Sequence, residues 1–96
     1  MLEEQRLEIL TRLLRIGLER GTYQEALLFG RRVLETDPTR EDVYRDLMRC
    51  YSRLGQRSEA LRQYRRCQDE LRSDLDLEPE TETTALAEQL ARGETI

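Results

Sequence analysis

Residues 54–64 read Leu54-Gly55-Gln56-Arg57-Ser58-Glu59-Ala60-Leu61-Arg62-Gln63-Tyr64. The middle of this run resembles an earlier one, Gly21-Thr22-Tyr23-Gln24-Glu25-Ala26-Leu27, and the two glycines lie 34 positions apart. The same offset carries Glu25-Ala26-Leu27 onto Glu59-Ala60-Leu61, Arg31-Arg32 onto Arg65-Arg66, and Leu13 onto Leu47. The chain therefore contains an internal repeat with a period of 34 residues.

A 34-residue period is typical of the tetratricopeptide (TPR) repeat, in which each unit is a helix, a turn and a second helix. The sequence therefore predicts an all-α, TPR-like fold: a right-handed array of antiparallel helix hairpins with about five helices. We expect a single domain over residues 1–96. It divides into repeat one at 7–40, repeat two at 41–74, and a linker with a capping helix at 75–92.

Apolar residues recur at the i, i+3, i+4 spacing of amphipathic helices in five segments. These segments cover residues 2–20, 23–35, 40–54, 58–74 and 80–91. Gly21 and Gly55 tolerate the left-handed backbone that ends a helix, and Pro38 disfavours helix in the residue before it. The short gaps between segments predict antiparallel neighbours.

The register of the two repeats predicts which side chains of the first and third helices face solvent on the inner, concave surface. These positions are Glu8, Thr11, Arg15, Leu18 and Glu19, and Asp42, Arg45, Asp46, Arg49, Ser52 and Arg53. The acidic residues 74–80 are predicted to form an extended strap along the helices, with Leu75 and Leu77 on one side of it.

The composition indicates a small helical domain with a net negative charge. Of the 96 residues, 38% are hydrophobic and 38% are charged, which fits one domain with the charge density of an exposed helical array. All 16 basic residues are arginine, and the net charge is −4. Because phosphate backbones are bound through accumulated positive charge, we expect no direct nucleic acid binding by this domain.

The sequence offers no catalytic or metal-binding motif. It has no histidine and no glycine-rich phosphate loop, and its two cysteines, Cys50 and Cys67, lack a CxxC spacing. We therefore expect no enzyme activity, no cofactor and no metal, with both thiols partly buried in a reducing cytosol. No signal peptide or apolar run of membrane-spanning length occurs, which predicts a cytoplasmic protein without membrane contact.

Four blocks of residues, taken together, resemble a known family. They are Asp37-Pro38-Thr39-Arg40-Glu41; Leu47-Met48-Arg49; residues 55–64; and Leu75-Asp76-Leu77-Glu78-Pro79 with Glu82-Thr83 and Leu86. In order and spacing they are similar to the bacterial transcriptional activator domain (BTAD), the TPR-like helical domain of SARP-type regulators of bacterial secondary metabolism and of related large signalling ATPases. The resemblance covers almost the whole chain and corresponds to the C-terminal part of the family domain.

The chain departs from the family pattern at two positions. Asp76 stands where the family usually has glycine, which implies a different or strained turn, and Gly30 replaces a residue that is commonly bulky in the second helix of a repeat. The resemblance also implies that earlier helices of the family domain and, in SARP-type regulators, a winged-helix DNA-binding domain would precede Leu2. It therefore implies a module that acts within a larger regulator.

Four arginines form the candidate binding site. Arg45, Arg49 and Arg53 are spaced i, i+4, i+8 on one face of the third helix, and Arg15 is the repeat equivalent of Arg49. Guanidinium groups bind carboxylates through planar, bidentate hydrogen bonds. We predict that this basic stripe binds an acidic segment of a partner or of a neighbouring domain. The alternative is a solvated face whose arginines pair with local aspartate and glutamate.

Two functions follow from these observations. The first is a non-catalytic protein–protein interaction and oligomerisation module of a bacterial transcriptional regulator, which contacts its own regulator's domains, another copy or the transcription machinery. The second is a free-standing TPR adaptor that binds a short acidic peptide of a partner protein. The apolar side of the first helix, with Leu2, Leu7, Ile9 and Ile16, has no cover in the predicted array, which predicts self-association as a homo-oligomer through that face.

Overall fold

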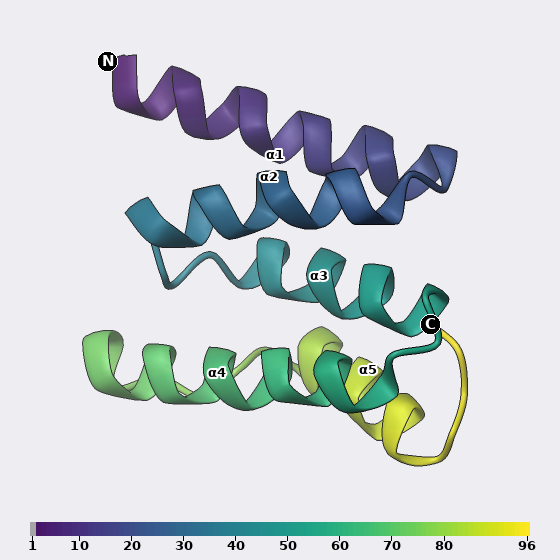
Figure 1. The fold of residues 1–96 in the computed structure, drawn as a ribbon. Coiled ribbons are helices and arrows are strands. Elements are labelled where there is room, and N and C mark those ends of the chain that lie inside the picture. The colour runs from purple at the N-terminus through teal and green to yellow at the C-terminus, as the bar shows by residue number, and fades with distance from the viewer. Residues whose placement is uncertain (1) are drawn as a thin grey trace.

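The computed structural model describes residues 2–96 and contains five α-helices (Figure 1). They are α1 (Leu2–Arg20), α2 (Tyr23–Thr36), α3 (Glu41–Arg53), α4 (Arg57–Leu75) and α5 (Thr81–Ala91). No strand occurs within residues 2–96, so the predicted all-α helical array is confirmed. Each helix boundary lies within one residue of its predicted position.

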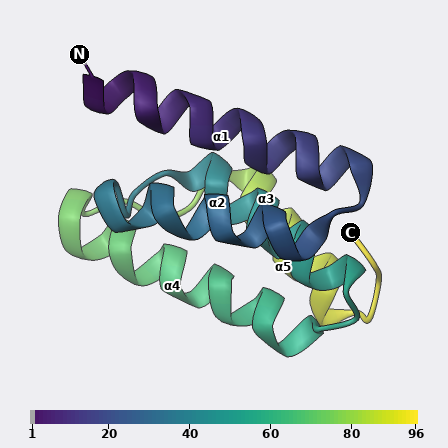
Figure 2. The same ribbon diagram turned by 45° about the horizontal axis from the view of Figure 1, so that its top comes forward.

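The first four helices follow one another across the molecule, and α5 packs against α3 and α4 (Figure 1). Contacts join α1 to α2, α2 to α3, and α3 to α4, and α3 also contacts α1 and α5. Among these five helices, α3 is therefore the one that touches all the others. Figure 2 shows α1 at one edge of the array, with a neighbouring layer on one side only.

Left-handed glycines end α1 and α3. Gly21 and Gly55 have φ angles of 81° and 76°, a region in which a side chain is strained. The N–H of Thr22 then donates to the carbonyl of Gly17 at 2.9 Å, and the residue after Gly55 makes the same bond. This is the Schellman motif, which satisfies the last free carbonyls of a helix and reverses the chain. The two repeats therefore share one turn geometry.

A non-glycine residue ends α4. Asp76 has φ 53° and ψ 41°, the single positive φ outside glycine among residues 2–96. Its N–H donates to the carbonyl of Arg72 at 3.2 Å. The guanidinium of Arg72 donates to both carboxylate oxygens of Glu78, at 2.7 and 3.0 Å, across the same turn. The strained turn expected at Asp76 is therefore present. A left-handed backbone at a residue that carries a Cβ raises the free energy of the folded state by about 1–2 kcal/mol.

Glycines set the spacing between neighbouring helices. A Cβ added to Gly17 of α1 would lie 2.8 Å from the Cβ of Ala26, so α1 and α2 meet closely at this point. A Cβ added to Gly30 of α2 would lie 2.6 Å from Cδ2 of Leu47, whose side chain is 1% exposed. Leu47 of α3 therefore occupies the space that a bulky residue at position 30 would need. This contact explains the second departure from the family pattern.

The structure corrects three of the predicted solvent-facing positions. Leu18, Asp46 and Ser52 are buried, at 8%, 3% and 8% exposure. Leu18 belongs to the hydrophobic core. Ser52 is covered because the N–H of Ile96 donates to its hydroxyl at 3.0 Å. The repeat register describes contacts within and between the hairpins, and it does not predict contacts with other segments such as the C-terminal residue.

The prediction of an extended strap over residues 74–80 is wrong in its first part. Asp74 and Leu75 belong to α4. This helix contains no proline or glycine that would end it earlier, so it continues to the left-handed backbone of Asp76. The side chains of Leu75 and Leu77 are 52% and 55% exposed, so they do not fasten the segment to the helices. Polar contacts hold this segment instead: Arg72 donates to Glu78, and the backbone N–H of Glu80 donates to Glu41.

The repeat register predicts that a long charged side chain at Ala60 is not tolerated. Ala60 is fully buried in the core on α4, at the repeat position of the fully buried Ala26. We expect Ala60→Arg to lower the free energy of unfolding by about 3 kcal/mol or more, because it overfills the helix interface and buries an unpaired charge. Urea unfolding measures the loss. The control is Ser73→Arg on the exposed side of the same helix, and equal stability of the two variants would contradict this packing.

The turn at Asp76 gives a prediction of the opposite sign. We expect Asp76→Gly to raise the free energy of unfolding by about 1 kcal/mol, since glycine adopts the left-handed backbone without strain and this gain exceeds its entropy cost in the unfolded chain. Asp76→Ala, which keeps a Cβ at the same backbone angle, serves as the control and should bring no gain. The melting temperature measures this gain. If the glycine variant melts at a temperature no higher than that of the parent, the turn at Asp76 is not strained.

Candidate interaction surfaces

The basic stripe begins with Arg45, which the structure places against α5. Nη1 of Arg45 donates to the hydroxyl of Thr83 at 2.9 Å. Its guanidinium also lies 3.7 Å from a carboxylate oxygen of Glu80 and 3.6 Å from one of Glu82. The Arg45 side chain is only 14% exposed. The acidic residues that contact Arg45, Glu80 and Glu82, therefore come from the same chain.

Glu41, one helical turn before Arg45, completes this contact. Its Oε2 accepts hydrogen bonds from the backbone N–H of Glu80 and from the hydroxyl of Thr83, both at 2.6 Å. The same oxygen lies 3.9 Å from Nη1 of Arg45. Thr83 is fully buried, and its hydroxyl donates a hydrogen bond to Glu41 and accepts one from Arg45. Two charged side chains of α3 therefore hold the first turn of α5.

Arg15 and Arg49 share one carboxylate. Nη1 of Arg49 donates to Oδ1 of Asp46 at 3.0 Å, and Nη2 of Arg15 reaches Oδ2 of the same residue at 3.4 Å. The side chain of Asp46 is 4% exposed, whereas that of Arg15 is 57% exposed. Asp46 thus links α1 to α3 between two arginines that occupy equivalent repeat positions. Removing either guanidinium would leave a buried charge with one partner fewer.

Arg53, the last residue of the basic stripe, contacts the C-terminal residue of the chain. Its Nη2 donates to the backbone carbonyl of Ile96 at 3.1 Å, on the exposed surface. Each of the four predicted arginines therefore has an acceptor within this chain. Binding of an outside partner to the stripe stays a prediction.

Sequence reasoning missed the acceptors. Asp46 was predicted only to face solvent, and Glu41 and Thr83 were named only within the family blocks. Two of them carry a usable signal, because Glu41 precedes Arg45 by four residues and Asp46 precedes Arg49 by three. These spacings bring opposite charges together on one helix face. Thr83 gave no signal, because its contact depends on where α5 packs.

A second surface lies on the outer side of α1. Four apolar side chains there are exposed: Leu2 (86%), Ile9 (58%), Leu13 (37%) and Ile16 (44%). We call these four residues the α1 stripe. An open hollow of about 290 Å³ lies beside Ile9 and is lined by Gln5, Glu8, Ile9 and Arg12, all from this one helix. Because α1 alone lines this hollow, no other helix of residues 2–96 packs against this part of α1.

The repeat shows what the α1 stripe corresponds to. The offset of 34 residues carries Ile9, Leu13 and Ile16 onto three residues of α3, namely Val43, Leu47 and Cys50. Those three are at most 1% exposed. Helix α2 packs against α3, and Leu47 lies in the recess at Gly30. Three of the four residues of the α1 stripe therefore occupy helix-packing positions of the repeat, and no other helix of residues 2–96 covers them.

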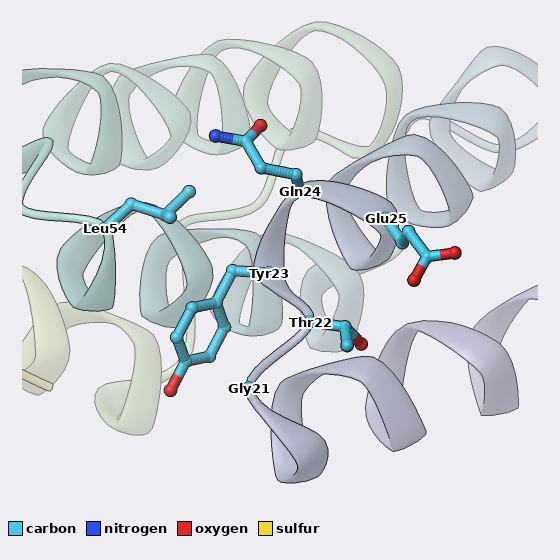
Figure 3. Close-up of a pocket in the computed structure, with 6 residues that line it drawn as sticks. All are labelled: Gly21, Thr22, Tyr23, Gln24, Glu25 and Leu54. Carbon is cyan, nitrogen blue, oxygen red and sulfur yellow. The ribbon is translucent and has the colours of Figure 1, made fainter.

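A third feature is a hollow at the helix turns (Figure 3). It measures about 230 Å³ and lies between the α1–α2 turn and the end of α3. The side chains of Tyr23, Gln24 and Leu54 surround it, whereas Thr22 and Glu25 point away (Figure 3). Pockets for small ligands usually enclose about 300–1,000 Å³ and have several polar groups that converge. This hollow has neither property, and we assign it no ligand.

Reactive side chains are scarce in the described part of the chain. Cys50 and Cys67 are fully buried, and burial raises the pKa of Cys50 to about 11 and that of Cys67 to about 12. Because the thiolate is the reactive form, both thiols are poor nucleophiles near neutral pH. Within residues 2–96 no group of three histidine, cysteine or acidic side chains is placed to hold a metal ion. No helix in this range is long and apolar enough to cross a membrane.

Two hairpins related by 34 residues, with a further helix across their end, define a helical-repeat protein. The family model for the bacterial transcriptional activator domain matches residues 1–91. The chain belongs to this family, and it is therefore a domain of the bacterial transcriptional activator type, as the four sequence blocks indicated. No curated protein and no solved structure matches the chain.

The α3–α5 contact predicts that Glu41 fixes the last helix. We expect Glu41→Ala to lower the free energy of unfolding by about 2–3 kcal/mol, because two hydrogen bonds to a charged acceptor are lost and the buried Thr83 hydroxyl loses a partner. Hydrogen exchange should quicken first in α5. The matched control is Glu88→Ala, which removes an exposed carboxylate from α5 itself. Unchanged exchange in α5 of the Glu41 variant would contradict the assigned role.

Proposed function

We propose that this chain is a non-catalytic protein–protein interaction module of a bacterial transcriptional regulator. The observation that carries the proposal is the α1 stripe, which is exposed although the repeat equivalents of Ile9, Leu13 and Ile16 on α3 are buried. Large exposed apolar patches on proteins mark sites of contact with other proteins. Membership of the family supplies the setting, and the stripe supplies the surface.

Binding, rather than catalysis, fits the groups that the chain presents. The two thiols are buried, and the two hollows described above are open and lack converging catalytic groups. What residues 2–96 do present is a set of helices with one apolar face and many exposed charges. The place of action in this proposal is the cytoplasm, where bacterial transcription occurs.

One observation favours the alternative function, an adaptor that binds a short acidic peptide. Glu80 and Glu82 lie against Arg45, so the basic stripe accepts carboxylates. A peptide would have to displace these residues from Arg45 or rely on Arg49 and Arg53 alone. Because Arg49 already pairs with the buried Asp46, we rank the adaptor below the α1 surface.

The test is a variant that charges the α1 stripe without touching the core. Ile9→Glu/Ile16→Glu alters two exposed side chains, so we expect it to fold and to melt within a few degrees of the parent. Placed in the native gene, it should change the set of transcripts that a deletion of the gene changes, because the apolar contact with the partner is lost. Genome-wide transcript levels measure the effect.

Two variants serve as controls. Leu28→Glu alters an apolar side chain of α2 that is 56% exposed, and it should leave transcript levels as in the parent. Arg49→Glu/Arg53→Glu tests the alternative on the basic stripe. If this variant changes transcript levels and the α1 variant does not, the adaptor function replaces the one proposed. Parental transcript levels in the α1 variant contradict the proposal on their own.

A further inference from the structure

We infer that α5 is a lid on α3 and α4 that opens as a unit while the first four helices stay folded, and that Glu41 and Arg45 hold it closed. We call these two side chains the clamp. In the closed state α5 lies against α3 and α4 (Figure 1). Opening exposes the clamp and the Cys67 thiol of α4. The lid therefore controls whether Arg45 of the basic stripe is accessible to another molecule.

Helix α5 buries little apolar surface. Of its 11 residues, Thr83, Ala87 and Leu90 are buried, and only the last two of these are apolar. Leu86 adds one side chain that is partly buried against the core. Helix α3, by comparison, buries six apolar side chains. Because the burial of an apolar face supplies most of the stability of a helix in a folded protein, α5 is attached more weakly than α3.

Polar contacts with α3 fasten both ends of α5. At its first turn the clamp binds the hydroxyl of Thr83, with Glu41 accepting at 2.6 Å and Arg45 donating at 2.9 Å. Beyond its last turn the N–H of Ile96 donates to the hydroxyl of Ser52 at 3.0 Å. Water replaces hydrogen bonds of this kind at a small net cost, whereas apolar surface gains no such replacement. These polar contacts therefore release α5 more readily than a buried apolar interface would.

The other four helices keep their mutual packing when α5 leaves. Among the helices of residues 2–96, α5 contacts only α3 and α4, and α3 has further contacts with α1, α2 and α4. The connection between α4 and α5 also has little packing to lose. Asp76 has a strained backbone there, and Leu77 is 55% exposed. Opening of α5 is therefore a local event that requires less free energy than unfolding of the whole array.

Cys67 lies close to the clamp and to α5. It is fully buried on α4, one helical turn after Tyr64, whose hydroxyl lies 3.4 Å from that of Thr84 on α5. Burial raises the pKa of the Cys67 thiol to about 12, and the nearby charges of Glu41 and Arg45 also act on this pKa. The thiol therefore becomes accessible to a reagent when α5 opens.

Cys50 lies on a different face, which α5 does not control. It is fully buried on α3 and follows Leu47 by three residues, so the two side chains share one side of the helix. Leu47 fills the recess at Gly30 of α2. The face that carries Cys50 is thus the one that α2 covers. Its thiol becomes accessible only when α2 and α3 separate, which means unfolding of the array.

The two native thiols test the lid in the parent chain. Iodoacetamide reacts with a thiol only while it is exposed, and mass spectrometry of peptides distinguishes the two sites. When labelling is slower than closing, the rate reports the open population. We expect Cys67 to react at least about tenfold faster than Cys50. The rate at Cys67 should also depend less on urea, because opening of one helix exposes less surface than global unfolding.

Two variants and a control separate the lid from the array. Val33→Ala leaves a cavity at a fully buried position of α2, and among the helices of residues 2–96 α2 contacts only α1 and α3. We expect this variant to speed labelling of Cys50 about tenfold and to leave Cys67 as in the parent. Glu41→Ala should speed labelling of Cys67 about 30-fold, the factor that corresponds to about 2 kcal/mol. Glu88→Ala removes an exposed carboxylate of α5 outside the clamp and should leave Cys67 as in the parent.

Three results would overturn the lid. If Cys67 in the parent chain reacts no faster than Cys50 and has the same dependence on urea, α5 opens only when the whole array unfolds. Equal acceleration of both thiols by Val33→Ala would lead to the same conclusion. An unchanged rate at Cys67 in Glu41→Ala would show that the clamp does not hold α5. None of these residues belongs to the α1 stripe, so each result leaves the proposed function to its own test.

Discussion

The burial of α3 is the constraint on which the rest of the structure depends. This helix is apolar around a wide arc, and Val43, Tyr44, Leu47, Met48 and Cys50 are all at most 1% exposed. A helix of this kind is stable only when other helices cover it on several sides. It contacts all four of the others, and its charged residues Glu41 and Asp46 add polar links to α5 and α1. The array is thus organised around its third helix.

The same constraint explains why α1 differs from α3 despite the repeat. Leu13 and Leu47 are equivalent in sequence, yet Leu13 is 37% exposed and Leu47 is 1% exposed. The difference comes from position in the array, because Leu47 has α2 beside it and Leu13 has no helix of residues 2–96 on that side. The exposed apolar face of α1 is therefore a helix-packing surface of the repeat that no other helix of residues 2–96 covers.

The contacts of the basic stripe show the limit of reading a site from one helix. The spacing of Arg45, Arg49 and Arg53 did place them on one face of α3, but it did not show what lies opposite. Arg45 faces α5, Arg49 shares the buried Asp46 with Arg15, and Arg53 reaches Ile96. These partners come from segments up to 43 positions away in the chain, and their approach is set by how the helices pack. An isolated helix pattern carries no information about that approach.

The sequence by itself determined the repeat, the five helices, the turns at Gly21 and Gly55, and the family, because local spacing and turn chemistry dictate each of them. It also indicated the strained turn at Asp76, where a left-handed backbone meets a residue with a side chain. Only the tertiary structure decided that Asp46 and Ser52 are buried, that Leu75 ends a helix with its side chain exposed, and that α5 binds Arg45. The physical reason is that burial and ion pairing depend on which surfaces meet across the array, and that is fixed by packing between residues distant in sequence.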